Sequence, residues 1–215
     1  MCIGGMCLHH IKLFLCEFSM FVENLIRDGN FSYIVQWCSK KDIVYLFGKD
    51  ILKRNRAGKE DAIYLKKEDS YEDHNLWIKA FGSTDSGISF LIEAEGKRLF
   101  HAGDLNNWHW KDESTPEEVA EAEKNYLKEL DDLVKVTDKL DVAMFPVDPR
   151  IGTDFMRGAQ QFVDHIKTNI FVPMHFDEAY ARAAAFRPLA EAEGARMIAL
   201  ERRGQCEEIE CETLI

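Results

Sequence analysis

The sequence predicts an α/β protein formed by a single domain. Apolar strand-like runs alternate with amphipathic helical segments through the second half of the chain, and this alternation favours packed layers of strands and helices. The composition is 46% hydrophobic, 11% aromatic and 30% charged, which is typical of a globular protein and excludes disordered and collagen-like chains. The 215 residues suit one domain, 1–215, with no internal repeat and no linker rich in Pro, Ser or Gly.

The N-terminal part predicts one helix followed by short strands. Residues 11–27 carry apolar side chains at steps of three and four, which is the spacing of an amphipathic helix, and a polar turn at 28–30 ends it. Short strands are expected around 33–37 and 43–47. The polar residues 49–74 predict exposed strands and turns.

The middle of the chain predicts a group of three strands at 76–80, 88–93 and 98–101. Glu95 and Gly96 separate the last two, and this dipeptide has the chemistry of a tight turn. We therefore expect these two strands to form a hairpin.

The second half of the chain alternates helices with strands. A helix begins after Thr115, because a Pro follows this residue and Glu118 comes three residues later, as in a capping box. Its apolar positions continue at steps of three and four as far as Leu133. The later elements are a strand at 141–146, a helix at 155–166, a strand at 169–173, a helix at 178–193 that ends at Gly194, and strands at 196–200 and 206–211.

Charge is distributed unevenly along the chain. Residues 1–60 hold 9 basic and 6 acidic side chains, whereas residues 61–215 hold 18 and 32, within a formal net charge of −11. An acidic body repels phosphate backbones and anionic lipid surfaces, so neither nucleic acid nor a membrane is an expected partner. We expect a small-molecule substrate instead, and we leave open whether the chain forms a homo-oligomer.

The expected compartment is the cytoplasm. None of the six cysteines forms a C-x-x-C pair, and a chain of this length does not need disulfides, so we expect reduced thiols. No apolar run reaches the roughly 18 residues that a membrane span requires. The apolar N-terminal stretch also lacks the basic residues and the cleavage site of a signal peptide.

Two short segments place metal-capable side chains just past the ends of apolar strands. Asp104 lies in the segment 100–110 (FHAGDLNNWHW), and His175 lies in the segment 171–176 (FVPMHF). Active sites collect at such strand ends in α/β folds, and carboxylate and imidazole are common ligands of zinc and iron. The pattern therefore predicts a shared metal site. The alternative is that Asp104 is a turn residue and His175 is a hydrogen-bonded strand end.

Four segments together resemble the metallo-β-lactamase superfamily, in its branch of metal-dependent hydrolases with an H-A-G-D segment. They are GSTDSGISF at 82–90, HAGD at 101–104, FPVD at 145–148 and PMHF at 173–176, and the resemblance covers residues 40–215. It implies an α/β/β/α sandwich in which Asp104 bridges two metal ions, usually zinc, and His175 binds the second. In that family a metal-bound hydroxide attacks a carbonyl or phosphorus centre.

The chain departs from this family in two places. The family's H-x-H-x-D-H segment is absent, and the early histidines His9 and His10 are adjacent, so they cannot occupy alternate positions of an extended strand. Ser83 stands where the family has a metal-binding His. We therefore expect a sandwich that is incomplete in its N-terminal sheet, with residues 1–39 divergent or truncated. Binding of zinc, or of manganese or iron, should be weak or absent, and the helix at 11–27 should cover the exposed sheet face.

Other polar residues near these segments have two interpretations each. His101 either hydrogen-bonds to a metal ligand or caps its strand, and Asp148 either orients a ligand or bonds the backbone of its turn. His109, between two tryptophans, lines a substrate wall or carries a proton, or it belongs to a loop that packs on the core. With Ser83, these residues complete the candidate site around Asp104 and His175.

Two functions follow from these observations. The first is a metal-dependent hydrolase of metallo-β-lactamase fold that acts on a small cytoplasmic substrate through a metal-activated water. The second is a non-catalytic relative or fragment that serves as a binding or packing module, as the missing segment and Ser83 favour. The metal content of the purified protein distinguishes the two.

Overall fold

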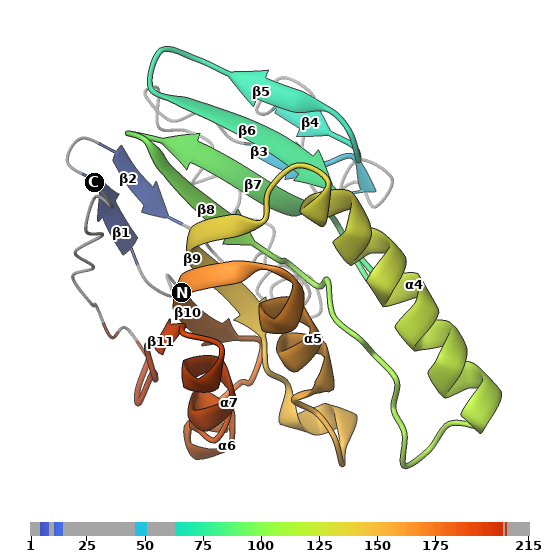
Figure 1. The fold of residues 1–215 in the computed structure, drawn as a ribbon. Helices are drawn as coiled ribbons and strands as arrows, with labels where there is room; N and C mark the ends of the chain where they lie inside the picture. Colours follow the sequence, from blue (N-terminus) through green and yellow to red (C-terminus); the bar gives the residue numbers. More distant parts are fainter. Residues whose placement is uncertain (1–4, 9–10, 15–45, 51–62, 204, 206–215) are drawn as a thin grey trace, which may run out of the picture.

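A mixed seven-stranded sheet forms the centre of the fold in the computed structural model, which describes residues 5–8, 11–14, 46–50, 63–203 and 205 (Figure 1). Its strands lie in the order β11 (Arg196–Met197), β10 (Lys167–Met174), β9 (Lys139–Pro146), β8 (Lys97–His101), β7 (Ser89–Ala94), β6 (Leu76–Phe81) and β5 (Ser70–Glu72). Strands β5 to β8 pair antiparallel, whereas β8 to β11 pair parallel. The carboxyl ends of β8, β9 and β10 therefore lie at one edge of the sheet.

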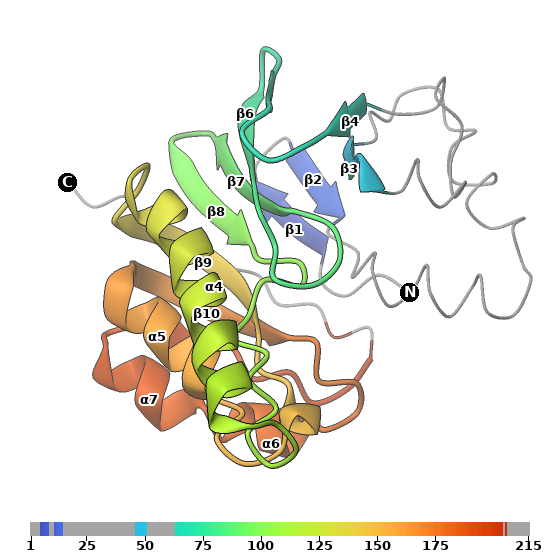
Figure 2. The ribbon, with the colours of Figure 1, turned by 90° about the vertical axis from the view of Figure 1, so that its right-hand side faces the viewer.

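Helices cover one face of this sheet, as Figure 2 shows for α4 (Pro116–Val134), α5 (Arg157–His165) and α7 (Arg187–Ala192). A short helix, α6 (Tyr180–Ala184), follows β10, and a 3-10 turn, η1 (Pro149–Ile151), follows β9. No helix in the described part of the chain has the length and apolar character needed to cross a bilayer.

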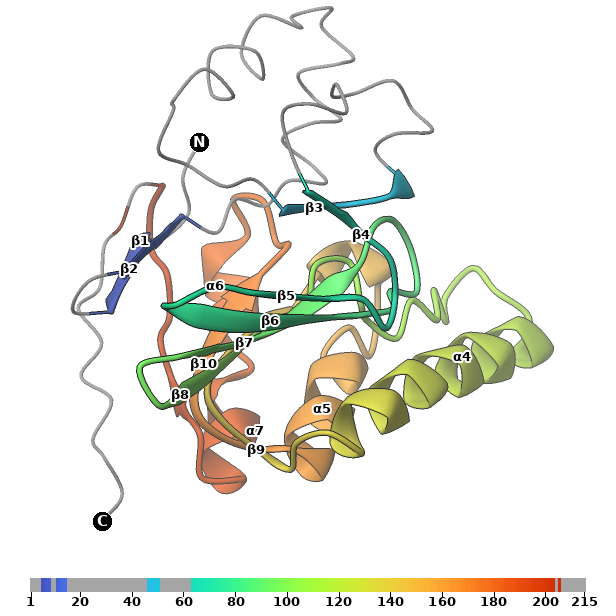
Figure 3. The same ribbon diagram turned by 90° about the horizontal axis from the view of Figure 1, so that it is seen from above.

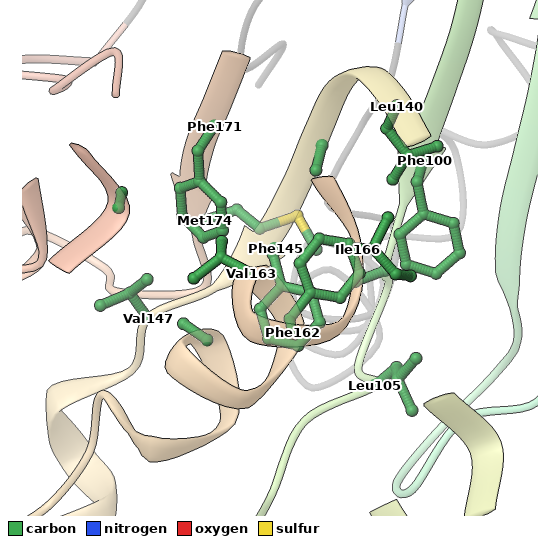
Figure 4. Packing of buried hydrophobic residues seen from close by; sticks show 14 of the residues in the cluster. Phe100, Leu105, Leu140, Phe145, Val147, Phe162, Val163, Ile166, Phe171 and Met174 are labelled. Carbon is green, nitrogen blue, oxygen red and sulfur yellow. The ribbon is translucent and has the colours of Figure 1, made fainter. Parts of the chain in front are cut away.

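Phenylalanine rings lie at the centre of the larger core, among Leu, Val, Ile, Ala and Met side chains, between the sheet and these helices (Figure 4). Phe162 of α5 is central: its ring centroid lies 4.6 Å from that of Phe145 on β9 and 5.7 Å from that of Phe100 on β8. Phe145 also lies 6.4 Å from Phe171 of β10. Aromatic pairs at these separations add to the free energy gained by burial. The cluster therefore fixes α5 to the three strands whose ends converge.

The opposite face of the sheet carries a second, smaller core, because neighbouring strand residues such as Leu91 and Ile92 point to opposite faces. Leu46 of β3 (Leu46–Gly48), which pairs in parallel with β4 (Ile63–Leu65), packs against this core. A further antiparallel pair is formed by β1 (Gly5–Leu8) and β2 (Ile11–Phe14). Figures 2 and 3 show both pairs on the side of the sheet away from α4 and α5.

The α/β class is confirmed, as a mixed α/β fold with one large sheet and helices. The capping box at the start of α4 is also present: the Thr115 backbone N–H donates to Glu118 Oε2 at 2.8 Å, and the Glu118 N–H donates to Thr115 Oγ1 at 3.3 Å. The hairpin between β7 and β8 has the expected turn, with positive φ at Glu95 (52°) and Gly96 (72°). The α/β/β/α sandwich with an incomplete N-terminal sheet stays a prediction.

The predicted helix at 11–27 is wrong over its first four residues, which form strand β2. A short apolar run fits the periods of a helix and of a strand almost equally well, and here β1 supplies a pairing partner, with Met6 opposite Leu13. Residues 15–27 lie outside the described residues. The predicted strands at 33–37 and 206–211 also lie outside them, as do residues 43–45 of the strand at 43–47.

The predicted helix at 178–193 is divided into α6 and α7. Pro188, in the first turn of α7, has no N–H to donate to a preceding carbonyl, so it cannot continue the hydrogen-bond ladder of α6. Gly194 ends α7 with a positive φ of 85°, as expected from its sequence. The predicted strand at 196–200 is shorter than expected, since β11 contains only Arg196–Met197.

We predict that Phe162→Ala destabilises the protein by about 3–5 kcal/mol, because it opens a cavity where α5 meets β8 and β9. A drop in melting temperature of roughly 10 °C should accompany this loss for a chain of this size. Thermal denaturation followed by circular dichroism checks it. Leu189→Ala is the control, because Leu189 is 39% exposed. Equal effects of the two substitutions would contradict the central place of Phe162.

Candidate functional site

The candidate site forms where the ends of three parallel strands converge. Backbone hydrogen bonds between these strands continue just past their ends. The Ala102 N–H donates to Met144 O at 2.9 Å, and the Val147 N–H donates to Met174 O at 3.0 Å. Asp104, Asp148 and His175 follow β8, β9 and β10, respectively. Asp104 and His175, which are 71 positions apart in sequence, thus meet because β8 and β10 both run parallel to β9 and lie on either side of it.

His175 lies between two buried carboxylates. Its Nδ1 is 2.8 Å from Asp148 Oδ2, and its Nε2 is 3.4 Å from Asp104 Oδ1. The three side chains are 9%, 1% and 5% exposed, in the order His175, Asp148, Asp104. His175 also has a φ of 65°, a left-handed conformation that is uncommon for a residue with a side chain. The tight turn after β10 thus aims the imidazole at both carboxylates.

The two carboxylates determine the charge of the ring. Burial alone lowers the pKa of His175, but the interactions with Asp104 and Asp148 outweigh it and raise the pKa to about 10. Burial likewise raises the pKa of Asp148, but His175 and Arg150 outweigh it and lower the pKa to about 2. At neutral pH, and without a metal ion, His175 is therefore an imidazolium that donates from Nδ1 to Asp148.

Trp108 and Arg150 border this cluster, and neither was predicted from the sequence as a site residue. The indole N–H of Trp108 donates to the backbone carbonyl of Asp104 at 2.8 Å, and its ring centroid lies 5.2 Å from that of His175. Arg150, on η1, contacts Asp148 through its guanidinium, with Nη2 2.6 Å from Oδ2. The only signals in the sequence were the position of Trp108 in the segment 100–110 and of Arg150 two residues after Asp148.

His101 is buried next to the site. Its Nδ1 accepts the Gly103 N–H at 3.1 Å, and burial lowers the pKa of His101 to about 4 despite the nearby charge of Asp104. Gly103 has a φ of 57°, and a Cβ there would lie 2.8 Å from the Ile88 carbonyl oxygen, so glycine is needed for the turn that leads to Asp104. His101 is therefore a neutral residue that supports the turn from the side of β8.

His109 and Ser83 lie in loops that border the site. His109 Nδ1 accepts the Lys111 N–H at 3.1 Å, and its Nε2 is 3.2 Å from the Asp154 carbonyl, so both ring nitrogens have backbone partners. Ser83 Oγ accepts the Asp85 N–H at 3.3 Å. The next residue, Thr84, joins this loop to the one after Asp104, with its hydroxyl 2.6 Å from the Asn106 carbonyl. The structure thus brings all six predicted residues into neighbouring loops and strand ends.

The site fits a metal ion in part. Two ligands bound to one tetrahedral ion at about 2.0–2.1 Å would themselves lie about 3.4 Å apart. Asp104 Oδ1 and His175 Nε2 lie at 3.4 Å, and a carboxylate behind the other ring nitrogen is usual for metal-bound imidazoles. Within the described part of the chain, however, no group of three or more His, Cys, Asp or Glu side chains is placed to hold an ion. His9 and His10 lie outside the described residues.

Comparisons with solved structures give weak likenesses to proteins of known fold. No family model and no curated protein matches the sequence. A protein assigned as a Zn-dependent hydrolase of the metallo-β-lactamase superfamily from Thermotoga maritima matches 55% of this chain, with 22% identity and a TM-score of 0.34. CmlA, a diiron β-hydroxylase from Streptomyces venezuelae, matches 72% of it, with 12% identity and a TM-score of 0.47.

These matches span 53% of the Thermotoga chain and 38% of the hydroxylase chain, so each known protein is matched over only part of its length. The structural neighbours thus include a hydrolase of the superfamily that the sequence resembles. At such scores the likeness carries no argument about function, which depends on the geometry of the site.

We predict that the metal-free protein loses stability as the pH rises from 6.5 towards 10. The folded state keeps the His175 proton up to a pKa of about 10, whereas the unfolded chain releases it near 6.5, so the stabilisation is complete below 6.5 and is lost above it. The free energy of unfolding should fall by roughly 3 kcal/mol by pH 9. Urea denaturation in the presence of a chelator measures it.

The matched variants are His175→Gln and His101→Gln. His175→Gln should remove the loss of stability at alkaline pH. His101→Gln should keep that loss, but it should remove a separate loss of stability at acidic pH. The acidic loss arises because the unfolded chain binds the His101 proton near pH 6.5, whereas the folded state binds it only near pH 4. An alkaline loss of unchanged size in His175→Gln would show that another group causes it.

Proposed function

We propose that this chain is a metal-dependent hydrolase of metallo-β-lactamase fold that acts on a small-molecule substrate. The observation that supports the proposal is the 3.4 Å separation between Asp104 Oδ1 and His175 Nε2, with Asp148 bonded to the opposite ring nitrogen. This is the separation expected for a carboxylate and an imidazole that bind one ion, so the two side chains would supply two of its ligands.

In this proposal Asp104 and His175 hold the ion, which is zinc, or manganese or iron in its place. When bound, the ion supplies a water of lowered pKa for attack on a carbonyl or phosphorus centre. Asp148 accepts the Nδ1–H of His175 and so keeps Nε2 as the binding nitrogen. Trp108 holds the backbone of Asp104 and covers the ring of His175, which limits the access of bulk water.

The metal-free state opposes tight binding. His175 carries a proton at neutral pH, and the ion must displace it from Nε2, so binding costs free energy in proportion to the raised pKa of His175. With only two protein ligands among the described residues, the affinity should be low. The acidic body of the chain favours a small-molecule substrate over nucleic acid or an anionic lipid surface. We also propose that the protein acts in the cytoplasm.

A second function is supported by the same cluster. From Arg150 through Asp148 and His175 to Asp104, positive and negative side chains alternate, so the buried charges are compensated without any ion. Ser83 also stands where the family has a ligand. These observations favour a non-catalytic relative that keeps the cluster as a structural element of a binding or packing module.

Calorimetric titration of the metal-free protein with zinc and with manganese separates the two functions. A hydrolase should bind about one equivalent, and both Asp104→Asn and His175→Gln should weaken binding at least about tenfold. Asp131→Asn and His165→Gln are the matched controls, because both residues are exposed on helices away from the site. Circular dichroism confirms that each variant is folded.

Titration in two buffers of different ionisation enthalpy should also show the release of about one proton for each ion bound. A well-folded chain that binds neither metal would support the binding or packing module. Tight binding that survives both Asp104→Asn and His175→Gln would show that other residues are the ligands.

A further inference from the structure

We propose that Arg150 is a positioning residue that sets the orientation of the His175 ring through Asp148. This role deepens the proposed function and rests on it as far as metal binding is concerned. Arg150 approaches the site from the side of Asp148: its guanidinium holds the carboxylate that bonds to the ring, and its Nη2 lies 3.0 Å from His175 Nδ1.

Arg150 holds both oxygens of Asp148. Its backbone N–H donates to Oδ1 at 2.9 Å, and its Nε lies 3.0 Å from Oδ1 and 3.0 Å from Oδ2. Its Nη2 donates to Oδ2 at 2.6 Å. A planar guanidinium that contacts two carboxylate oxygens fixes the rotation of the carboxylate as well as its position. Asp148 therefore presents Oδ2 in one direction.

His175 uses that same oxygen. Its Nδ1 is 2.8 Å from Asp148 Oδ2, and Nδ1 is also 3.0 Å from Arg150 Nη2. Two N–H donors cannot bond to each other, so their short separation follows from sharing one acceptor. The direction of Oδ2 decides where the Nδ1–H points, and because the ring is rigid, it also decides where Nε2 lies relative to Asp104.

Among the three side chains in contact, Arg150 is the one that reaches the solvent. The side chain of Arg150 is 47% exposed, whereas that of Asp148 is 1% exposed. A buried carboxylate that loses its guanidinium keeps the charge of His175 as its main partner and is free to rotate about its own bonds. A shift of about 0.5 Å at Nε2 is already large for a metal site.

The chain offers a matched control in Arg157. Its Nη2 lies 2.7 Å from Glu123 Oε1 and 2.9 Å from Oε2, so this pair has the same two-point geometry as the pair of Arg150 and Asp148. It joins α5 to α4 and includes neither Asp148 nor His175. Arg157→Gln therefore removes an arginine–carboxylate pair without touching the ring, and any effect common to both variants reflects general stability.

The experiment compares the wild type with Arg150→Gln, Arg150→Lys and Arg157→Gln by two measurements. The first is the proton NMR signal of the His175 Nδ1–H in the metal-free protein, which is visible only while the proton is held in a buried hydrogen bond. The second is the affinity for zinc measured by calorimetry. His175→Gln assigns the NMR signal by removing it.

We expect Arg150→Gln to broaden or lose the Nδ1–H signal and to weaken zinc binding about 10- to 100-fold. Arg150→Lys keeps the charge but loses the two-point contact, so it should lie between Arg150→Gln and the wild type. Arg157→Gln should change neither measurement. A signal and an affinity unchanged in Arg150→Gln, or lowered equally in Arg157→Gln, would overturn the proposal.

The two measurements also separate this proposal from the proposed function. If the wild type binds neither zinc nor manganese, the hydrolase proposal fails and the NMR signal alone decides the role of Arg150. Loss of the signal in Arg150→Gln with its retention in Arg157→Gln then supports the positioning role. Retention of the signal in both variants rejects it.

Discussion

The ion pair between His175 and two buried carboxylates depends on one constraint, the parallel pairing of β8, β9 and β10. Parallel neighbours end at the same edge of a sheet, so the first residues beyond each strand must lie close together. A reversal of β9 would move Asp148 to the opposite edge and leave the ring of His175 with one carboxylate. The direction of the strands therefore brings the three side chains together, and their chemistry then decides how they interact.

Packing behind the sheet keeps that edge in place. The phenylalanine cluster around Phe162 fixes α5 to the strands (Figure 4). At the start of α5, a Cβ on Gly158 would clash with the side-chain oxygen of Asn106, so glycine allows the helix to contact the loop that carries Asp104. The hydroxyl of Tyr126 on α4 donates to the Gly158 carbonyl at 2.7 Å. Two helices thus support the loop from behind.

The buried charges of the ion-pair network belong to the same residues that would hold the proposed metal ion. A proton on His175 Nε2 and a metal ion at the same nitrogen exclude each other, and the two carboxylates that make the imidazole a strong base also hold its proton firmly. Because of this competition, the affinity for a metal ion separates an enzyme from a binding module. In the enzyme the ion takes the place of the proton on His175 Nε2, whereas in the binding module the proton stays.

The sequence by itself determined several local features and the residue types that stand at the strand ends. Thr115 and Glu118 specified where α4 begins, Glu95 and Gly96 specified the hairpin, and Asp104 and His175 were recognisable as donors at strand ends. These features depend on a few neighbouring residues, so periodicity and turn chemistry predict them well.

Only the tertiary structure decided which residues meet. It brought Asp104, Asp148 and His175 together at one edge of the sheet and placed Arg150 against Asp148 behind the ring. The contacts between these three residues join positions that are far apart in sequence, and their geometry depends on strand order and direction. A single sequence carries no periodic signal for these, because many strand orders bury the same apolar faces equally well.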